Sequence, residues 1–96
     1  MFDFGNAIKA MKLGSKVARV GWNGKGMFLY YVPANSYPAT TQIAKDYWGE
    51  KQPKDDPAVP LVPYGAYIAM KTAQENVVPW LASQTDMLAE DWEIVQ

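Results

Sequence analysis

The sequence contains no histidine and no cysteine among its 96 residues. The lack of cysteine excludes a disulfide framework, a thiolate nucleophile and a sulfur-ligated zinc, iron–sulfur or haem site. The lack of histidine excludes an imidazole general base, a Ser-His-Asp triad and a metal site built on two histidines. We therefore expect a binding protein rather than an enzyme, with no catalytic residue, no cofactor and no metal.

Long hydrophobic runs and an excess of positive charge are also missing. No apolar run approaches the roughly 20 residues that span a bilayer, and the N-terminus lacks the apolar core and small-residue cleavage site of a signal peptide. The net charge of −1 argues against a protein that binds the nucleic-acid backbone. We expect no membrane and no nucleic-acid partner, and a cytoplasmic location by default.

The short chain predicts one small domain over residues 1–96. A chain of this size buries only about 60–70% of its unfolded surface, so a homo-oligomer is expected to cover more of it. Aromatic residues are plentiful, at 3 Phe, 4 Trp and 6 Tyr, which suits a protein that binds a ligand.

The charges are distributed unevenly along the chain. Residues 1–25 have a net charge of +4, and residues 72–96 have a net charge of −5 with no cation. One interpretation is that the two ends attract each other in the fold or across a dimer. The other is that a small anion is held near Arg19 and Lys25.

The first third of the chain predicts a helix followed by a β-hairpin. Asp3 precedes apolar residues at positions 4, 7, 8 and 11, the spacing of one face of an amphipathic helix, and Gly14 is placed to end it. Two β-branched and aromatic runs, 16–20 and 27–32, flank Asn23-Gly24, a dipeptide typical of a type I′ turn because both residues adopt positive φ readily. Trp22 and Lys25 are then expected opposite each other beside the turn.

The remaining residues predict two short helices and three more strands. Residues 33–38 are expected to form a loop, Thr40 or Thr41 to cap a helix that ends before Gly49, and the proline-rich residues 50–63 to form a surface loop. A second hairpin is expected over 66–72 and 77–81, with Pro79 at a sheet edge or bulge.

The chain is expected to end with a short helix and a final strand. Ser83 is placed to cap that helix, with Asp86 in the capping-box position, and residues 92–95 predict the strand. Together the elements indicate an α+β fold, with an N-terminal helix packed on a mainly antiparallel sheet of about five strands and two short additional helices.

Two segments concentrate side chains that are suited to ligand recognition. Residues 19–28 combine Arg19, Trp22, Asn23 and Lys25 with exposed glycine backbone. An indole can stack on a flat base, and the two cations can contact phosphate oxygens. The alternative interpretation is a tight turn with one loosely packed aromatic residue.

The second segment, 78–92, follows a tryptophan with hydroxyl and carboxylate groups at a helix N-terminus. Free backbone N–H groups there favour an anion, and Asp86 and Asp91 can accept hydrogen bonds from ribose hydroxyls or a base amino group. The alternative is that Ser83 and Asp86 only cap the helix. A glycosidase-like pair of Asp86 with Asp91 or Glu90 is a weak hypothesis, because ten acidic residues make some pairing inevitable.

Three segments together resemble a known family. They are FGNAIKAMKLG (4–14), KVARVGWNGKGMF (16–28) and VPWLASQTDMLAEDWEIV (78–95). They resemble the Thoeris anti-defence type two proteins, a family of small phage proteins. The resemblance implies a non-enzymatic sponge that binds cyclic ADP-ribose isomers, the alarm signals of bacterial Thoeris immunity, and holds them intact in the cytoplasm of the infected host.

The same resemblance implies further ligands, partners and site residues. Some members also bind cyclic dinucleotides, and members form homotetramers with ligand sites between subunits. Trp22 and Trp80 are the implied residues for stacking the adenine. The remaining implied contacts are Asn23 and Lys25 in the first motif and Ser83, Thr85 and Asp86 in the second, with Arg19 as a further candidate phosphate contact.

One alternative function belongs to a different class. The chain is then a protein-interaction module that docks a host partner through exposed Trp22, Trp48 and Trp80. A carbohydrate-binding module also uses tryptophan platforms, but the lack of a secretion signal weighs against it.

Overall fold

The computed structural model describes all 96 residues, which form two compact units. Unit 1 consists of residues 1–32 and 67–96, and unit 2 consists of residues 33–66. The predicted α+β class is confirmed, since three α-helices accompany a mainly antiparallel five-stranded sheet and a two-stranded sheet. Chains below about 40 residues rarely fold alone, and unit 2, residues 33–66, is shorter than this. That the two units fold together as a single domain over residues 1–96 stays a prediction.

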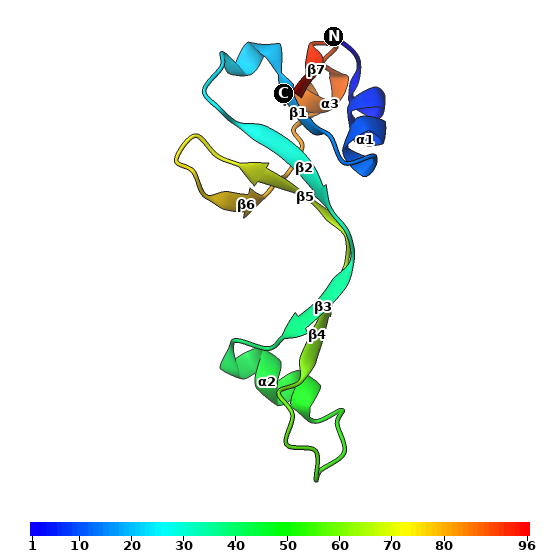
Figure 1. Ribbon diagram of the computed structural model, residues 1–96, viewed down its shortest axis with the longest axis vertical. Coiled ribbons are helices and arrows are strands. Elements are labelled where there is room, and N and C mark those ends of the chain that lie inside the picture. Colours follow the sequence, from blue (N-terminus) through cyan, green and yellow to red (C-terminus); the bar gives the residue numbers. More distant parts are fainter. The chain divides into compact units, whose positions relative to one another are not determined.

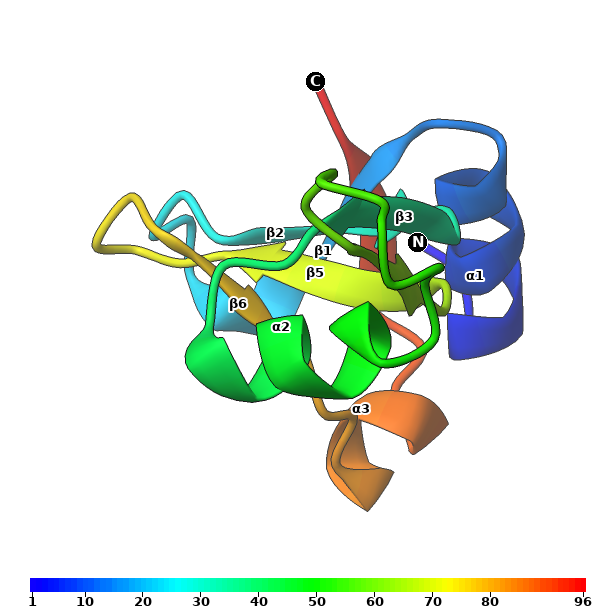
Figure 2. The same cartoon turned by 90° about the horizontal axis from the view of Figure 1, so that it is seen from below.

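The five-stranded sheet of unit 1 is antiparallel throughout. Its order is β6-β5-β2-β1-β7, so the first and last strands of the chain are neighbours. Figure 1 labels these strands, and Figure 2 shows β2, β5 and β6 side by side. Their bounds are β1 Lys16–Arg19, β2 Phe28–Val32, β5 Tyr67–Lys71, β6 Val77–Pro79 and β7 Trp92–Val95.

The N-terminal helix α1, Phe4–Lys12, covers one face of this sheet and forms the core with it. Asp3 starts the helix because its carboxylate accepts a hydrogen bond from the Asn6 amide at 2.9 Å, and Gly14 follows its end at φ +98°. The helix packs against β1, β2 and β7. The buried core residues are Ala7, Met11, Val17, Leu29 and Trp92.

The connection between β1 and β2, residues 20–27, differs in part from the predicted hairpin. Asn23 (φ 58°) and Gly24 (φ 63°) both have the predicted positive φ. Val20, however, was expected in the strand and instead begins a 3₁₀ helix, η1 Val20–Trp22. Its amide still bonds to Asp91 O at 2.9 Å in register with β7, but its carbonyl accepts from the Asn23 amide at 3.1 Å, which closes the turn early.

The second predicted hairpin and the last short helix are confirmed. β6 is an edge strand, and Pro79 is tolerated there because an edge leaves some N–H positions without a ladder partner. The helix α3, Gln84–Leu88, has a complete capping box between Ser83 and Asp86. It contacts α1 and leads directly into β7 (Figure 1).

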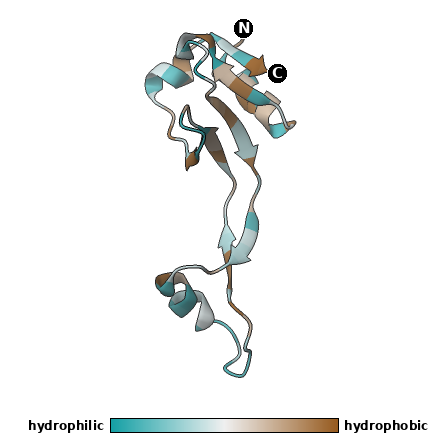
Figure 3. Cartoon of the chain, turned by 60° about the vertical axis from the view of Figure 1, so that its left-hand side comes forward, coloured by the Kyte–Doolittle hydropathy of each residue, from teal (hydrophilic) through white to brown (hydrophobic).

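Unit 2 consists of a two-stranded sheet and one helix. Its elements are β3 Asn35–Pro38, α2 Gln42–Gly49 and β4 Leu61–Tyr64. Thr41 caps α2 as predicted, with its hydroxyl accepting from the Ala44 amide at 3.2 Å. Figure 3 shows hydrophilic and hydrophobic stretches along α2.

Two loop predictions in unit 2 are corrected. The predicted loop 33–38 contains β3, and the last three residues of the predicted loop 50–63 belong to β4. Both strands contain a proline, a residue more typical of a loop. In a two-stranded sheet both strands are edges, so a proline without an N–H can occupy a position that needs no donor. None of the three α-helices is both long and apolar enough to cross a membrane.

Candidate ligand-binding site

A cavity of about 450 Å³ lies in unit 1 between β1, the 20–27 connection and β7. We call it the Trp22 cavity. Its volume falls within the range of about 300–1,000 Å³ typical of small-molecule sites. The lining residues that offer polar groups or an aromatic ring are Arg19, Trp22, Gly24, Lys25, Gly26 and Glu93.

Trp22 is half-buried and is fixed by the core behind it. Its ring meets the ring of the fully buried Trp92 edge to face, with centroids 5.5 Å apart and planes at 78°. Edge-to-face pairs of this kind are favourable because the positive edge of one ring meets the negative face of the other. The indole therefore forms a cavity wall held in place by the core.

Lys25 and Glu93 supply exposed charges of opposite sign around the same cavity. The Lys25 ammonium makes no ion pair or hydrogen bond with another group of the chain, so its charge is free for a ligand. Glu93 stands on β7 opposite Ala18 of β1 in the strand register. The cavity thus offers one free cation, one carboxylate and an aromatic wall.

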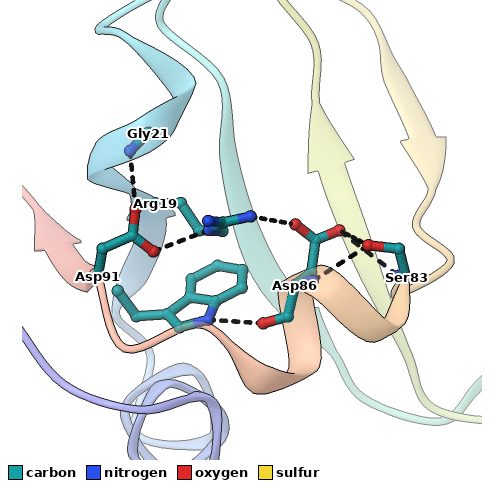
Figure 4. A network of polar contacts seen from close by, with 6 residues as sticks. Arg19, Gly21, Ser83, Asp86 and Asp91 are labelled. Carbon is teal, nitrogen blue, oxygen red and sulfur yellow. Dashed lines mark hydrogen bonds and ion pairs between the residues drawn. The ribbon is translucent and has the colours of Figure 1, made fainter.

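Arg19 also lines the cavity, but two carboxylates already hold its guanidinium. Its Nε donates to Asp91 Oδ1 at 2.8 Å and its Nη1 donates to Asp86 Oδ1 at 2.9 Å (Figure 4). The ion pairs confirm that the basic N-terminal part and the acidic C-terminal part attract each other within the fold. Of the two cations that line the cavity, Lys25 is the one whose charge is not taken up by the chain.

Asp91 and Asp86 each connect Arg19 to a second element. Asp91 Oδ2 accepts the Gly21 amide of η1 at 2.9 Å, and Asp86 Oδ2 accepts the Ser83 hydroxyl at 2.9 Å in the capping box. The Trp92 indole N–H donates to the Asp86 carbonyl at 3.0 Å. Figure 4 shows this network, which ties β1 and η1 to α3 and β7.

The network shifts the pKa of two side chains, Asp91 and Arg19. The hydrogen bond from Arg19, followed by that from the Gly21 amide, holds the pKa of the Asp91 carboxyl below its ordinary value. In return, the hydrogen bonds to Asp91 and then Asp86 raise the pKa of the Arg19 guanidinium above its ordinary value. Both groups are therefore charged at neutral pH.

The lowered pKa of Asp91 predicts an acid-dependent loss of stability. A carboxyl whose pKa is lower in the folded chain stabilises the fold above its unfolded pKa of about 3.9, and this contribution is lost as the pH falls through the folded pKa. Asp91→Asn is expected to unfold at lower urea concentration than wild type at pH 7, with a difference that narrows below about pH 4. An equal difference at pH 7 and pH 3 would contradict this role.

The structure brings only part of the predicted site residues together at the cavity. Trp22, Lys25 and Arg19 line it. Asn23, which lies between Trp22 and Lys25 in the sequence, is exposed and caps the end of η1, and it is not among the lining residues. Trp22 and Lys25 are expected opposite each other beside the turn; both line the cavity, but Trp22 lies in η1 and not in a strand, so the two do not form a cross-strand pair.

The residues of the second motif are not among those that line the cavity. Trp80 is half-buried and packs against Phe4 and Trp92, with centroids 5.9 and 6.1 Å apart. Ser83 and Asp86 cap α3, and Thr85 is exposed on that helix. Capping, the alternative interpretation of Ser83 and Asp86, is therefore confirmed as a role of both residues.

Sequence reasoning missed Glu93 as a lining residue. It was interpreted only as part of the acidic C-terminal charge. The signal that could have found it is the pairing of the final strand with 16–19, because the register places Glu93 beside Ala18 and next to Arg19. No three carboxylates of the chain lie close enough together to hold a metal ion.

Comparison with known proteins identifies the family. The family model of the Tad2-like domain, described as the Thoeris anti-defense 2-like domain, matches residues 2–95. The chain belongs to the Thoeris anti-defense 2-like family. It is also 39% identical over 94 residues to the protein named Thoeris anti-defense 2 of Bacillus phage SP01, covering 97% of this chain and 93% of that protein.

Family membership confirms the resemblance carried by the three sequence segments and extends it to nearly the whole chain. It assigns this Thoeris anti-defense 2-like chain a phage role against Thoeris immunity. The match spans the Trp22 cavity, the Arg19 network and unit 2 alike.

Proposed function

We propose that the chain binds a cyclic ADP-ribose isomer in the Trp22 cavity and holds it intact in the cytoplasm of the infected bacterium. The Thoeris effector then lacks its activating signal. The observation that carries the proposal is the meeting of an aromatic wall, a free ammonium and a carboxylate around one cavity of about 450 Å³. Family membership supports the choice of a Thoeris signal as the ligand.

Each part of such a ligand has a matching group around the cavity. The adenine stacks on the indole of Trp22, an arrangement worth about 1–3 kcal/mol in nucleic-acid complexes. The pyrophosphate meets the unpaired ammonium of Lys25 and the exposed backbone amides of the glycine-rich connection. Glu93 accepts hydrogen bonds from ribose hydroxyls or the adenine amino group.

The proposal includes assembly into a homotetramer in which two chains enclose each ligand. This follows from the resemblance and from the demand on a sponge, which must win by affinity because each site removes one signal molecule. Walls from two chains exclude water better than one open cavity. Trp80, Asn23, Ser83, Thr85 and Asp86 remain proposed contacts, and cyclic dinucleotides remain proposed additional ligands.

Holding without cleavage is consistent with the composition of the chain. With no histidine or cysteine, the chain has neither of the side chains that most often serve as general base or nucleophile near neutral pH. Nearby, Arg19 occupies the carboxylates of Asp86 and Asp91 in ion pairs. We therefore propose a binder with no enzymatic activity.

The decisive experiment is recovery of the ligand after binding. Purified protein is mixed with a cyclic ADP-ribose isomer, freed of unbound ligand and then denatured, and the released molecule is identified by mass. We expect the intact cyclic isomer, and native mass spectrometry before denaturation is expected to show a tetramer with bound ligand. Heat-denatured protein is the control for carry-over. Recovery of a linear product would replace sequestration by hydrolysis.

The alternative, docking of a host protein through exposed tryptophans, has less support than ligand binding. Trp22, Trp48 and Trp80 were expected to be exposed, and all three are half-buried, while Trp92 is fully buried. Trp22 and Trp80 pack against the ring of Trp92, and Trp48 packs against Tyr47. The chain therefore offers no fully exposed indole as an anchor.

A further inference from the structure

The 20–27 connection carries most of the polar wall of the Trp22 cavity, yet little of it is regular secondary structure. Apart from η1, it contains no helix or strand, and Asn23, Gly24 and Gly26 all have positive φ. Such a segment is free to sample other shapes unless other elements hold it. The residues that hold it therefore control the shape of the cavity.

The Val20 amide bonds to the Asp91 carbonyl, and the Trp22 ring packs on Trp92. Beyond these contacts, two side chains from distant parts of unit 1 bind the backbone of the connection, one near each end. At its start, Asp91 Oδ2 accepts the Gly21 amide at 2.9 Å. At its end, the Lys71 ammonium donates to the Gly26 carbonyl at 2.8 Å. Neither Asp91 nor Lys71 is among the residues that line the cavity.

Gly21 is fitted closely against Asp91, and Gly26 lies in ordinary contact with Lys71. A Cβ on Gly21 would lie 3.1 Å from Asp91 Oδ2, and a Cβ on Gly26 would lie 3.5 Å from the Lys71 ammonium, at a φ of +78° that favours glycine. Each charged group is itself oriented by further contacts. Arg19 holds Asp91, while Glu75 and the ring of Phe28 flank Lys71.

We infer that Asp91 and Lys71 are positioning residues that preorganise the Trp22 cavity for its ligand. The inference rests on the proposed function, because it concerns the same site. Fixing a binding segment in its bound shape before the ligand arrives raises affinity by lowering the ordering cost of binding. Removal of either attachment should weaken binding although neither side chain touches the ligand.

Lys16 provides a matched control for charge. Its ammonium lies over the same Phe28 ring as that of Lys71, at 4.9 Å against 5.6 Å, but it makes no bond to the connection. Lys16→Met and Lys71→Met therefore remove the same charge from the same ring. Lys71→Met also removes the donor to Gly26 and the ion pair with Glu75, so Glu75→Gln, which removes that ion pair and leaves the Gly26 donor in place, is a second control.

The test combines two measurements on the full chain. In the free protein, hydrogen exchange of the amides in 21–26 is expected to be faster in Lys71→Met than in wild type or Lys16→Met. In calorimetry with a cyclic ADP-ribose isomer, Lys71→Met and Asp91→Ala, which remove the donor to Gly26 and the acceptor for the Gly21 amide, are expected to bind about three- to tenfold more weakly than wild type. Lys71→Arg, which keeps a donor for Gly26, should bind within about twofold of wild type.

The outcomes separate the inference from the proposed function. If wild type binds and Lys71→Met behaves like Lys16→Met in both measurements, the positioning role is overturned and the proposed function stands. If wild type binds none of the isomers tested, the proposed function fails, and the role of the two attachments in binding fails with it. Thermal unfolding of each variant shows whether a weaker affinity reflects loss of the fold. If the weaker binding of Lys71→Met comes only from unfolding, the positioning role is also overturned.

Discussion

Replacement of Trp92 by alanine is expected to lower the free energy of unfolding of unit 1 by about 3–5 kcal/mol. The ring is fully buried and meets the rings of Phe4, Trp22 and Trp80, so its removal leaves a cavity at the centre of the core. It also removes the donor to the Asp86 carbonyl. Small domains have only about 5–15 kcal/mol in total, so the loss is a large fraction of their stability.

Urea unfolding followed by tryptophan fluorescence measures this loss. Trp48→Ala is the control, because Trp48 lies in unit 2 and is not part of the core cluster. Should Trp92→Ala fail to fold, Trp92→Phe keeps much of the ring packing while removing the indole N–H, and about 1–2 kcal/mol of destabilisation is expected. A Trp92→Ala chain as stable as Trp48→Ala would show that Trp92 is not central to the core.

Loss of the Trp22 ring is expected to weaken binding of a cyclic ADP-ribose isomer at least tenfold, equivalent to about 1.4 kcal/mol. The indole is the aromatic wall of the cavity, and its stacking on the adenine has no substitute among the other lining residues. Lys25→Ala is expected to have a loss of about the same size, which shrinks at high salt because the contact is ionic. The double variant is expected to lose about a hundredfold if the two contacts are independent.

Calorimetry on the folded variants measures these losses. Lys9→Ala is the control for charge, since Lys9 is an exposed lysine on α1 away from the cavity lining. Trp80→Ala tests the second implied stacking residue separately, because Trp80 lies outside the lining and packs on Phe4 and Trp92. Wild-type affinity in both Trp22→Ala and Lys25→Ala would place the ligand site elsewhere.

Local signals in the sequence predicted most elements of unit 1 correctly. Asp3 and Ser83 cap their helices, Asn23 and Gly24 take positive φ, and Pro79 lies on an edge strand. Each of these outcomes depends on the chemistry of a residue and its near neighbours. Such signals can be read without knowing the rest of the fold.

The errors occurred where a distant residue or a pairing partner decided the structure. The chain turns out of the strand at Val20, whose carbonyl accepts the Asn23 amide, and the carboxylate of Asp91 holds the Gly21 amide of this turn from 70 positions along the chain. The strands β3 and β4 form because they pair with each other, although the prolines in them suggested loops. Patterns within a short window carry no information about either partner.

The candidate site shows the same division. The sequence by itself indicated a binding protein rich in aromatic residues, selected Trp22 and Lys25, and placed opposite charges at its two ends. The tertiary structure decided which charges pair, since the β1–β7 register and the capping box bring Arg19 between Asp91 and Asp86 and leave Lys25 free. It also added Glu93 to the cavity. The physical reason is that residue type fixes what a side chain can bind, whereas only the packing of distant segments fixes which partner it reaches.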